Sequence, residues 1–159
     1  MTRTEAAVRL RDTRPVDLPS IQAIYAHHVL NGLASFEETA PDLAEIHRRY
    51  ETTLAQGFPH IAAEITGTGG QPILAGYAYA GAYRTRPAYR YSVENSVYIA
   101  QDCLGRGVGR RLLTELIGRC TALGFRQMIA VIGDSGNAAS IGLHMALGFT
   151  PAGTITSVG

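Results

Sequence analysis

The stretch CLGRGVGRRLLTELIGRC, residues 103–120, places three glycines at alternate positions and then continues into an amphipathic segment. Val108, Leu112, Leu116 and Cys120 recur every four residues, and this spacing predicts a helix with one apolar face. The first N–H groups of a helix have no intrahelical partner and the helix dipole is positive there, so phosphate oxygens can bind at this end. Glycines would let a bulky anion approach that backbone. The stretch therefore predicts a phosphate site at a helix start.

The same glycines would also suit a flexible turn between a strand and a helix, with Arg106, Arg110 and Arg111 solvated around it. We favour phosphate binding because three alternating glycines are more than such a turn needs, and the arginines add positive charge. The spacing G-x-G-x-G fits neither the dinucleotide pattern GxGxxG nor the P-loop, which ends in GK[ST]. The sequence therefore indicates a phosphate ligand of another kind.

Periodicity along the rest of the chain predicts alternating helices and strands. Helices are expected over 17–30, with Asp17 as the N-cap, and over 42–57, 108–124 and 137–148. Strands are expected over 6–12, 60–66, 73–83, 91–100 and 125–133, and again from 149 onward. The strands over 60–66 and 73–83 should form an antiparallel pair. The order β-α-α-β-β-β-α-β-α-β has no internal repeat and predicts one α/β domain over 1–159.

Composition narrows the class of protein. The 159 residues, 46% of them hydrophobic, suit one domain with a substantial core. The net charge of +1 creates no overall field, so neither nucleic acid nor a membrane surface is an expected partner. No apolar run approaches the roughly 20 residues that span a bilayer, and residues 1–10 lack a signal-like apolar core, which predicts a cytoplasmic protein. We expect both cysteines, Cys103 and Cys120, to be reduced, and no metal site.

Two motifs together resemble a known family. LGRGVGRRLL, residues 104–113, resembles the pyrophosphate loop of the GCN5-related N-acetyltransferase (GNAT) superfamily, and NAASIGLHMALGF, residues 137–149, resembles its second cofactor motif. ASFEETAP (34–41), AGYAYAGAYRTRPAYRYSVENSVYIA (75–100) and AVIGDSGNAASIGLHMALGFTPAG (130–153) resemble the branch of phosphinothricin and methionine sulfoximine N-acetyltransferases. The resemblance covers most of the chain.

The resemblance implies an α/β (α+β) fold of the GNAT type, with a mixed, mostly antiparallel central sheet, a splay between two strands and helices on both faces. It implies acetyl-CoA as cofactor, direct acetyl transfer to the amine of a small amino-acid-like substrate, resistance to such compounds as a biological role, and a homodimer. The residues that it places on the cofactor are Val97, Tyr98, Ile99, Leu104, Gly105, Arg106, Gly107, Val108, Gly109, Arg110, Asn137 and Ser140. Leu104 departs from the family's usual Gln or Arg.

Acetyl transfer to an amine needs a base, because an α-amino group is mostly protonated near neutral pH. Glu94 interrupts an otherwise apolar strand, and partial burial would raise the pKa of its carboxyl group. A solvated glutamate on the open face of the sheet is the alternative. The flanking pattern SVENSVYI resembles the catalytic strand of the branch, so we predict that Glu94 is the base.

The departing CoA thiolate needs a proton, and the oxyanion formed by attack needs donors. The resemblance implies His144 as the proton donor, and an imidazole can serve near neutral pH. Its alternative is a histidine packed locally on a helix. Backbone N–H groups around Val97 to Ile99 are the expected oxyanion donors.

The acceptor site rests on weaker signals. Phe36 and Glu37 could form one wall of the pocket, and Tyr83, Arg84 and Arg86 precede the Glu94 strand, where the arginines could bind a carboxylate or phosphinate. A solvated loop explains these arginines equally well. Interleaved Arg and Tyr would suit RNA, but one short loop in a nearly neutral chain argues against it.

Two other functions stay open at this point. A noncatalytic acyl-CoA-binding or sensing module would keep the glycine loop and Asn137 without needing Glu94. A protein or polyamine N-acetyltransferase would favour an acidic acceptor groove. Relatives continue through a further strand, so we expect the last strand here to be cut short. The acceptor could be phosphinothricin, methionine sulfoximine, methionine sulfone or an ordinary amino acid, since one methylene shifts preference by only about 1–3 kcal/mol.

Overall fold

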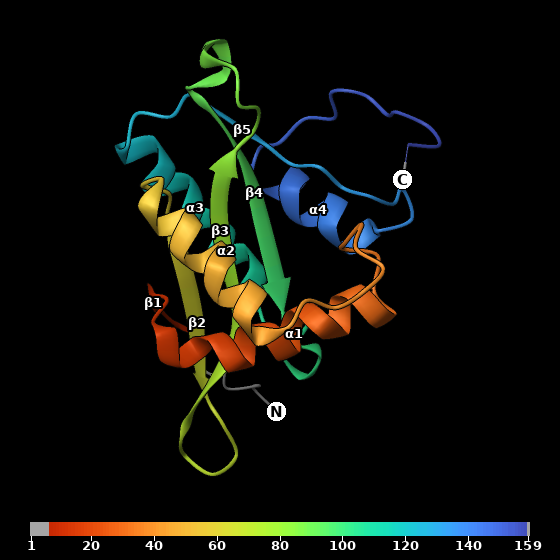
Figure 1. Ribbon diagram of the computed structural model, residues 1–159. Coiled ribbons are helices and arrows are strands. Elements are labelled where there is room, and N and C mark those ends of the chain that lie inside the picture. The colour runs from red at the N-terminus through yellow and green to blue at the C-terminus, as the bar shows by residue number, and fades with distance from the viewer. Residues whose placement is uncertain (1–6, 159) are drawn as a thin grey trace.

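The computed structural model describes residues 7–158, so Ala6 and Gly159, at the ends of two predicted strands, lie outside it. One five-stranded sheet runs through the molecule in the order β1-β2-β3-β4-β5 (Figure 1). Its strands are β1 (Arg9–Asp12), β2 (His60–Thr66), β3 (Pro72–Ala82), β4 (Ser92–Ile99) and β5 (Gln127–Ile129). The first four pair antiparallel, as predicted for β2 and β3, and β4 and β5 pair parallel. The sheet is therefore mixed and mostly antiparallel.

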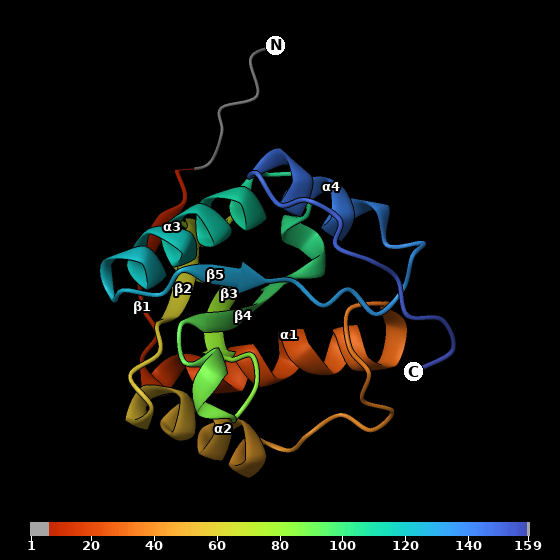
Figure 2. The same cartoon turned by 90° about the horizontal axis from the view of Figure 1, so that it is seen from above.

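Helices cover both faces of the sheet. Seen from above, α1 (Leu18–Asn31) and α2 (Leu43–Ala55) lie on one side, and α3 (Val108–Ala122) and α4 (Ala138–Ala146) lie on the other (Figure 2). Short 3-10 turns, Pro15–Asp17, Pro87–Tyr89 and Gln101–Cys103, complete the connections. No helix within residues 7–158 has the length and apolar character to cross a membrane. The predicted α/β fold with helices on both faces is confirmed.

The apolar stripe of α3 forms the centre of the larger core. Leu112, Leu113 and Leu116 are fully buried, and Val108 and Cys120 are nearly so. All of these except Leu113 pack in one core with buried residues of β2, β3 and β4. Each buried leucine side chain contributes about 1.5–3 kcal/mol. This packing fixes where the start of α3, and hence the glycine loop, lies relative to β4.

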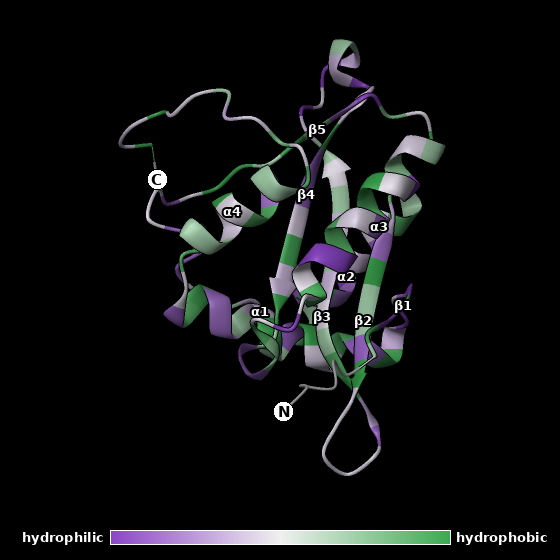
Figure 3. Ribbon diagram, turned by 180° about the vertical axis from the view of Figure 1, so that it is seen from behind, coloured by the Kyte–Doolittle hydropathy of each residue, from purple (hydrophilic) through white to green (hydrophobic). Residues whose placement is uncertain are grey.

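A second core lies under α1 and α2 and is rich in tyrosine. Tyr25, Tyr77 and Tyr98 are buried there, and the rings of Tyr25 and Tyr98 meet edge to face at 5.0 Å. Such edge-to-face pairs stabilise beyond simple area burial. Figure 3 shows hydrophobic stretches along the strands, whereas exposed turns of α2 are hydrophilic. The sheet is thus covered on both sides.

The sheet splits at its far end. β4 pairs with β3 as far as Ile99, but with β5 only over Ser92–Glu94. We call the point after Glu94, where β4 and β5 separate, the fork. Within the described chain, residues 95–99 have no strand partner on that edge. The predicted splay is confirmed, and it also explains why the predicted strand over 125–133 forms a ladder only over Gln127–Ile129.

One local prediction is wrong, and another is confirmed only in part. The expected strand from 149 onward does not form within the described residues, because 149–158 make no backbone ladder with β5. Asp17 stands at the N-cap position of α1 but makes no capping bond to that helix. Its carboxylate instead accepts hydrogen bonds from Arg11 Nη1 and Nη2, at 2.7 and 2.8 Å, and from Arg14 N, at 2.7 Å. The Asp17 carboxylate therefore binds the Arg11 guanidinium and the Arg14 backbone instead of the first N–H groups of α1.

Candidate active site

The fork opens into a cleft of about 660 Å³. Ligand sites usually fall in the range of about 300–1,000 Å³. Its walls come from β4, the starts of α3 and α4, the 33–37 segment and the 130–133 segment. The predicted site residues that line it are Phe36, Glu37, Glu94, Val97, Tyr98, Ile99, Leu104, Gly105, Gly107, Val108, Gly109, Arg110, Asn137, Ser140 and His144. Residues far apart in sequence therefore meet in one space.

The start of α3 is left without a side-chain cap. Gly107 is its N-cap, with φ of +74°, and Gly105 has φ of +70°. Both values lie in the left-handed region, where other residues are strained. By contrast, Asp42 caps α2 by accepting from Glu45 N at 2.8 Å. No side chain within residues 7–158 therefore occupies the N–H groups at the start of α3, which is the geometry that the predicted anion site requires.

Gly109 has a different reason to be glycine. A Cβ built at this position would lie 3.3 Å from Leu143 Cδ2 and 3.7 Å from Ile99 Cγ1. The residue therefore allows the first turn of α3 to pack closely against α4 and β4. Of the three alternating glycines, Gly105 and Gly107 thus allow left-handed turns of the backbone, and Gly109 allows close packing.

Asn137 begins α4. Its side-chain oxygen accepts from Ser140 N at 3.1 Å, which is an N-cap. The cap does not use the amide NH₂ group of Asn137, and the residue lines the cleft. The geometry therefore supports both a structural part and a ligand-facing part for this residue.

Glu94 occupies the fork itself. It is the last β4 residue paired with β5, opposite Ile129, and it lines the cleft. Burial raises the pKa of its carboxyl group, and the positive charge of Arg84 partly opposes this increase. A half-buried carboxylate with a raised pKa is suited to accept a proton. The site brings this group into the same space as the glycine loop.

His144 is buried at 7% exposure and faces two polar partners. Nδ1 lies 2.7 Å from the Ser140 carbonyl oxygen, and Nε2 lies 3.0 Å from Asn95 Oδ1. The Phe149 ring meets the imidazole edge-on at 4.9 Å. His144 is therefore packed and hydrogen-bonded, and it also borders the cleft. The two predicted alternatives are not mutually exclusive.

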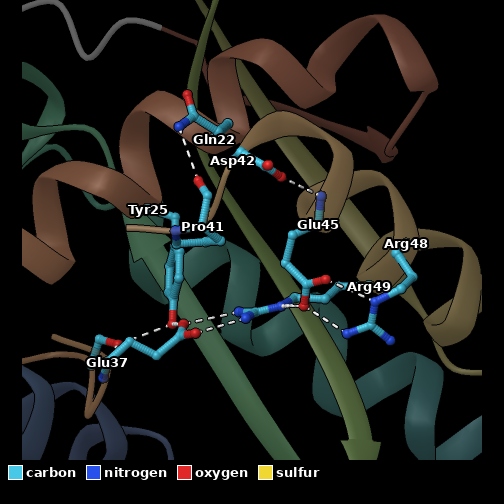
Figure 4. A network of polar contacts seen from close by, with 9 residues as sticks. Gln22, Tyr25, Glu37, Pro41, Asp42, Glu45, Arg48 and Arg49 are labelled. Atoms are coloured by element: carbon cyan, nitrogen blue, oxygen red, sulfur yellow. Dashed lines mark hydrogen bonds and ion pairs between the residues drawn. The ribbon is translucent and has the colours of Figure 1, made fainter. Parts of the chain in front are cut away.

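The 33–37 segment is held by a polar network that joins α1 and α2 (Figure 4). Arg49 donates to both carboxylate oxygens of Glu37, at 2.6 and 2.9 Å, and Tyr25 donates to the same carboxylate. The hydrogen bonds from Arg49 lower the pKa of Glu37, although burial opposes this. The Glu37 charge is thus already paired.

Phe36 contacts the opposite wall. A Cβ built on Gly133 would lie 2.9 Å from Phe36 Cζ, so the ring sits directly on the bare backbone there. Phe36 is otherwise 58% exposed. One aromatic side chain therefore spans from the α1–α2 connection to the segment after β5.

Four predicted site residues do not line the cleft: Tyr83, Arg84, Arg86 and Arg106. The first three lie in the connection between β3 and β4, where Arg84 stacks over the Tyr83 ring at 5.1 Å. Only the charge of Arg84 reaches the site, through its effect on Glu94. Arg106 is exposed between two glycines that turn the chain.

Sequence reasoning missed several residues that the fold brings to the cleft, notably Asn95, Gly133 and Leu143. Asn95 is buried at 8% exposure on the face shared with Val93 and Val97. A polar residue in an otherwise apolar face was the available signal. Gly133 and Leu143 carried none, because their importance lies in contacts with distant segments.

Comparison with known proteins agrees with this geometry. The acetyltransferase (GNAT) family pattern matches residues 21–149. A phosphinothricin N-acetyltransferase of Alcaligenes faecalis is 54% identical over 153 residues, which cover 96% of this chain and 75% of that protein. An L-methionine sulfoximine/L-methionine sulfone acetyltransferase of Pseudomonas aeruginosa is 43% identical over 150 residues, covering 94% and 84%. The crystal structure of a phosphinothricin acetyltransferase from Sinorhizobium meliloti with acetyl-CoA has a TM-score of 0.85 at 50% identity, covering 92% of this chain and 76% of that one.

A mixed sheet that splits beside an uncapped, glycine-rich helix start is a geometry suited to a phosphorylated ligand. The family pattern and the relatives identify the class more closely. The chain belongs to the acetyltransferase (GNAT) family, and its predicted likeness to the phosphinothricin and methionine sulfoximine branch is confirmed.

Proposed function

We propose that this protein is an acetyl-CoA-dependent N-acetyltransferase that acetylates the amino group of a small amino-acid-like substrate, of the phosphinothricin, methionine sulfoximine or methionine sulfone type. The observation that carries the proposal is the position of Glu94. Its half-buried carboxylate lies at the fork, inside the cleft that also contains the glycine loop. A sensing module would need the loop but not this carboxylate.

The residues present fit acetyl-CoA as the acetyl donor. Gly105 and Gly107 expose the backbone at the start of α3, and Arg110 adds a positive charge beside them in the cleft. The unpaired edge of β4 over Val97 to Ile99 provides backbone groups for an amide-bearing arm. When bound, acetyl-CoA supplies an acetyl group activated as a thioester.

The residues of the chain then handle two protons. Glu94 accepts one from the acceptor ammonium group, and the free amine forms a C–N bond to the acetyl carbon. His144 would give a proton to the CoA sulfur as it leaves, which completes the exchange of the C–S bond for the C–N bond. Backbone N–H groups around Val97 to Ile99 stabilise the developing oxyanion. Transfer is direct, without an acetylated enzyme residue.

On the acceptor side, Phe36 and Glu37 form one wall. Because Arg49 already neutralises Glu37, this wall is better suited to a neutral or zwitterionic acceptor than to a polycation such as a polyamine. The positive charge of Arg84, which acts on Glu94, would also favour an acceptor that bears a carboxylate. Tyr83 and Arg86 stay as weaker predictions, because they lie outside the cleft.

We further infer one catalytic domain over 1–159, a homodimer, a cytoplasmic location, and a part in resistance to amino-acid-like inhibitors, without nucleic acid or membrane partners. The near-neutral charge supports the last point. Light scattering of the purified protein tests the assembly, with a mass of one chain, 17.0 kDa, contradicting the dimer.

The decisive experiment measures CoA-thiol release from acetyl-CoA with phosphinothricin, methionine sulfoximine, methionine sulfone, free amino acids, spermidine and a lysine peptide. Glu94→Gln should lower kcat on an amino-acid analogue about 10²–10⁴-fold, the usual contribution of a general base. Glu38→Gln, an exposed glutamate in the α1–α2 connection, is the matched control. Tight acetyl-CoA binding without turnover of any acceptor would instead indicate the sensing module.

A further inference from the structure

The side chain of Asn95 bridges three elements at the fork. Its Nδ2 group donates to the Ile129 carbonyl oxygen of β5 at 3.3 Å, and its Oδ1 faces Nε2 of His144 on α4 at 3.0 Å. Asn95 itself belongs to β4 and is 8% exposed. A buried amide can be oriented by its neighbours, because its oxygen only accepts and its nitrogen only donates. The Ile129 carbonyl fixes Nδ2 on that side and leaves Oδ1 toward the imidazole.

The other imidazole nitrogen faces a second acceptor. Nδ1 of His144 lies 2.7 Å from the Ser140 carbonyl oxygen, which can only accept. The hydroxyl of Ser140 also approaches Nδ1, but at 3.5 Å it is at the outer limit of a hydrogen bond. The much shorter distance to the carbonyl oxygen favours a hydrogen on Nδ1. Nε2 faces the Asn95 oxygen, another acceptor, and can form a hydrogen bond there only if it carries a hydrogen too. Both contacts are satisfied together only by the doubly protonated ring, since the neutral ring offers a single N–H.

The neighbourhood contains no competing ionic contact to the ring among the described hydrogen bonds. Apart from Ser140 and Asn95, the imidazole meets the Phe149 ring. The charged or titratable groups that line the same cleft are Tyr25 and His28 of α1, Glu37 of the α1–α2 connection, Tyr79 of β3, Glu94 and Tyr98 of β4, Cys103, and Arg110 of α3. None of them is hydrogen-bonded to His144 among the residues that the structure describes. The two acceptors thus dominate the polar surroundings.

We propose that Asn95 is a positioning residue that holds His144 as a two-donor imidazolium at the edge of the cleft, ready to give its Nε2 proton to the leaving thiolate. The inference rests on the proposed function of His144 and adds the residue that prepares it. In the resting protein the Nε2–H group donates to the neutral Asn95 oxygen. An anionic sulfur is the stronger acceptor, because hydrogen bonds to ionised groups are roughly twice as strong as neutral ones.

A purely structural role for Asn95 is the competing explanation, since its bond to Ile129 also joins the two strands at the fork. Substitutions separate the two roles. Asn95→Asp keeps an acceptor toward His144 but loses the donor toward Ile129. Asn95→Leu removes both at similar size. Asn31→Leu, an exposed asparagine at the end of α1, is the matched control.

The first measurement is the protonation state of His144 in protein labelled with ¹⁵N-histidine, read from long-range ¹H–¹⁵N spectra near neutral pH. The His144 signals are assigned by their loss in His144→Gln. We expect two protonated nitrogens in the wild type, in Asn95→Asp and in Asn31→Leu, and a neutral Nδ1–H ring in Asn95→Leu. A neutral ring in the wild type, or an unchanged imidazolium in Asn95→Leu, would overturn the inference.

The second measurement is the pH profile of turnover. Asn95→Leu should lower kcat at least tenfold, within the range for general acids, and shift the alkaline limb of kcat to lower pH. Asn95→Asp should recover most of kcat, and the KM for acetyl-CoA should stay within about twofold. If Asn95→Leu does not fold, judged by its thermal unfolding, Asn95→Ala replaces it.

Failure of the inference can be distinguished from failure of the proposed function. The spectra need no turnover, so the expected ring states in a protein that acetylates nothing would uphold the positioning role and reject the function. Normal turnover with equal kcat in the leucine and aspartate variants would uphold the function and reject the positioning role.

Discussion

The two sides of the cleft present different chemical groups, main-chain groups on one side and side chains on the other. The proposed cofactor side comprises Leu104, Gly105, residues 107–110, Asn137 and the β4 edge over 97–99, and it offers mainly main-chain groups. The acceptor side comprises residues 33–37, Glu94 and residues 130–133. There the walls are side chains, held by ion pairs and ring contacts to distant elements.

This difference has physical consequences. Main-chain N–H groups carry no titratable charge, so the cofactor side should respond little to pH but strongly to a change of backbone conformation. Ionisable and aromatic side chains depend on protonation and on the packing beneath them. The acceptor side should therefore be the pH-sensitive and size-sensitive half. Four predictions test this contrast, from the largest expected effect to the smallest.

The largest effect should come from His60, a buried residue of β2 that lies beside the cleft residue Tyr79. Its ring stacks on Tyr79 at 5.2 Å, and its Nδ1 lies 2.8 Å from Thr13 Oγ1. Burial lowers its pKa from 6.5 to about 4. The native ring thus stays neutral while the unfolded ring gains a proton. The contribution of the neutral His60 ring to the free energy of unfolding is fully present above pH 6.5. About 3 kcal/mol of it is lost as the pH falls toward 4.

Urea unfolding of the wild type and His60→Gln across this pH range measures the effect. The variant should lose less stability between pH 6.5 and 4 than the wild type, whereas His47→Gln, on α2, should follow the wild-type slope. Parallel slopes for wild type and His60→Gln would refute the assignment to His60.

The next effect concerns the backbone of the cofactor side. Gly107→Val places a β-branched residue at φ of +74°, which costs about 1–2 kcal/mol. If the loop shifts to relieve the strain, affinity for acetyl-CoA should fall about tenfold, and the acceptor KM should not change. Calorimetric titration with acetyl-CoA measures this loss.

Gly118→Ala is the control, since Gly118 lies within α3 with open space at the Cβ position. It should stabilise the protein by about 0.5–1 kcal/mol and leave acetyl-CoA affinity unchanged. Equal affinities for Gly107→Val and wild type would show that the loop conformation does not matter for the donor.

A smaller effect is expected where Phe36 crosses to Gly133. Gly133→Ala brings a methyl group within 2.9 Å of the present ring position, so the exposed ring must move. The acceptor KM should rise several-fold, about 1 kcal/mol, with the acetyl-CoA KM unchanged. Gly142→Ala, on the open side of α4, is the control and should change neither KM. Steady-state kinetics with both substrates varied measures the two KM values. A change in the KM for acetyl-CoA, with the acceptor KM unchanged, would contradict the prediction.

The smallest effect should come from Arg84. Its charge partly offsets the raised pKa of Glu94, so Arg84→Gln should raise that pKa further. Because Glu94 must be deprotonated to act, the acid limb of kcat/KM should move to higher pH, by less than about one unit for an exposed arginine. Arg90→Gln, in the same connection, is the control. A shift in the opposite direction would remove Arg84 from the electrostatics of the site.

The sequence predicted the backbone of the proposed cofactor side well because its signals are local. The helix start after Gly107, the helix that follows Asn137 and the stripe through Leu112 each depend on residues a few positions apart. The same locality explains the correct prediction of the helices and of the β2–β3 pair. Prediction from local patterns fails where strand pairing is long-range. The sequence predicts one strand over 125–133, but the fork leaves only Gln127–Ile129 in the sheet.

The acceptor side shows which contacts the sequence alone could not predict. Glu37 was predicted at the wall, but its pairing with Arg49 depends on how α2 packs beside the α1–α2 connection. Arg84 and Arg86 were expected in the pocket, and the turn after β3 instead carries them outside it.

By itself, the sequence determined the family, the order of the helices and of the strands as far as β5, and the glycine-rich helix start proposed to meet the donor, because turns and apolar periodicity are short-range properties of the chain. Only the tertiary structure decided that Asn95 faces His144, that Phe36 rests on Gly133 and that Asp17 pairs with Arg11 rather than capping α1. These contacts join residues whose relative positions depend on the packing of whole elements, and no local pattern encodes that geometry.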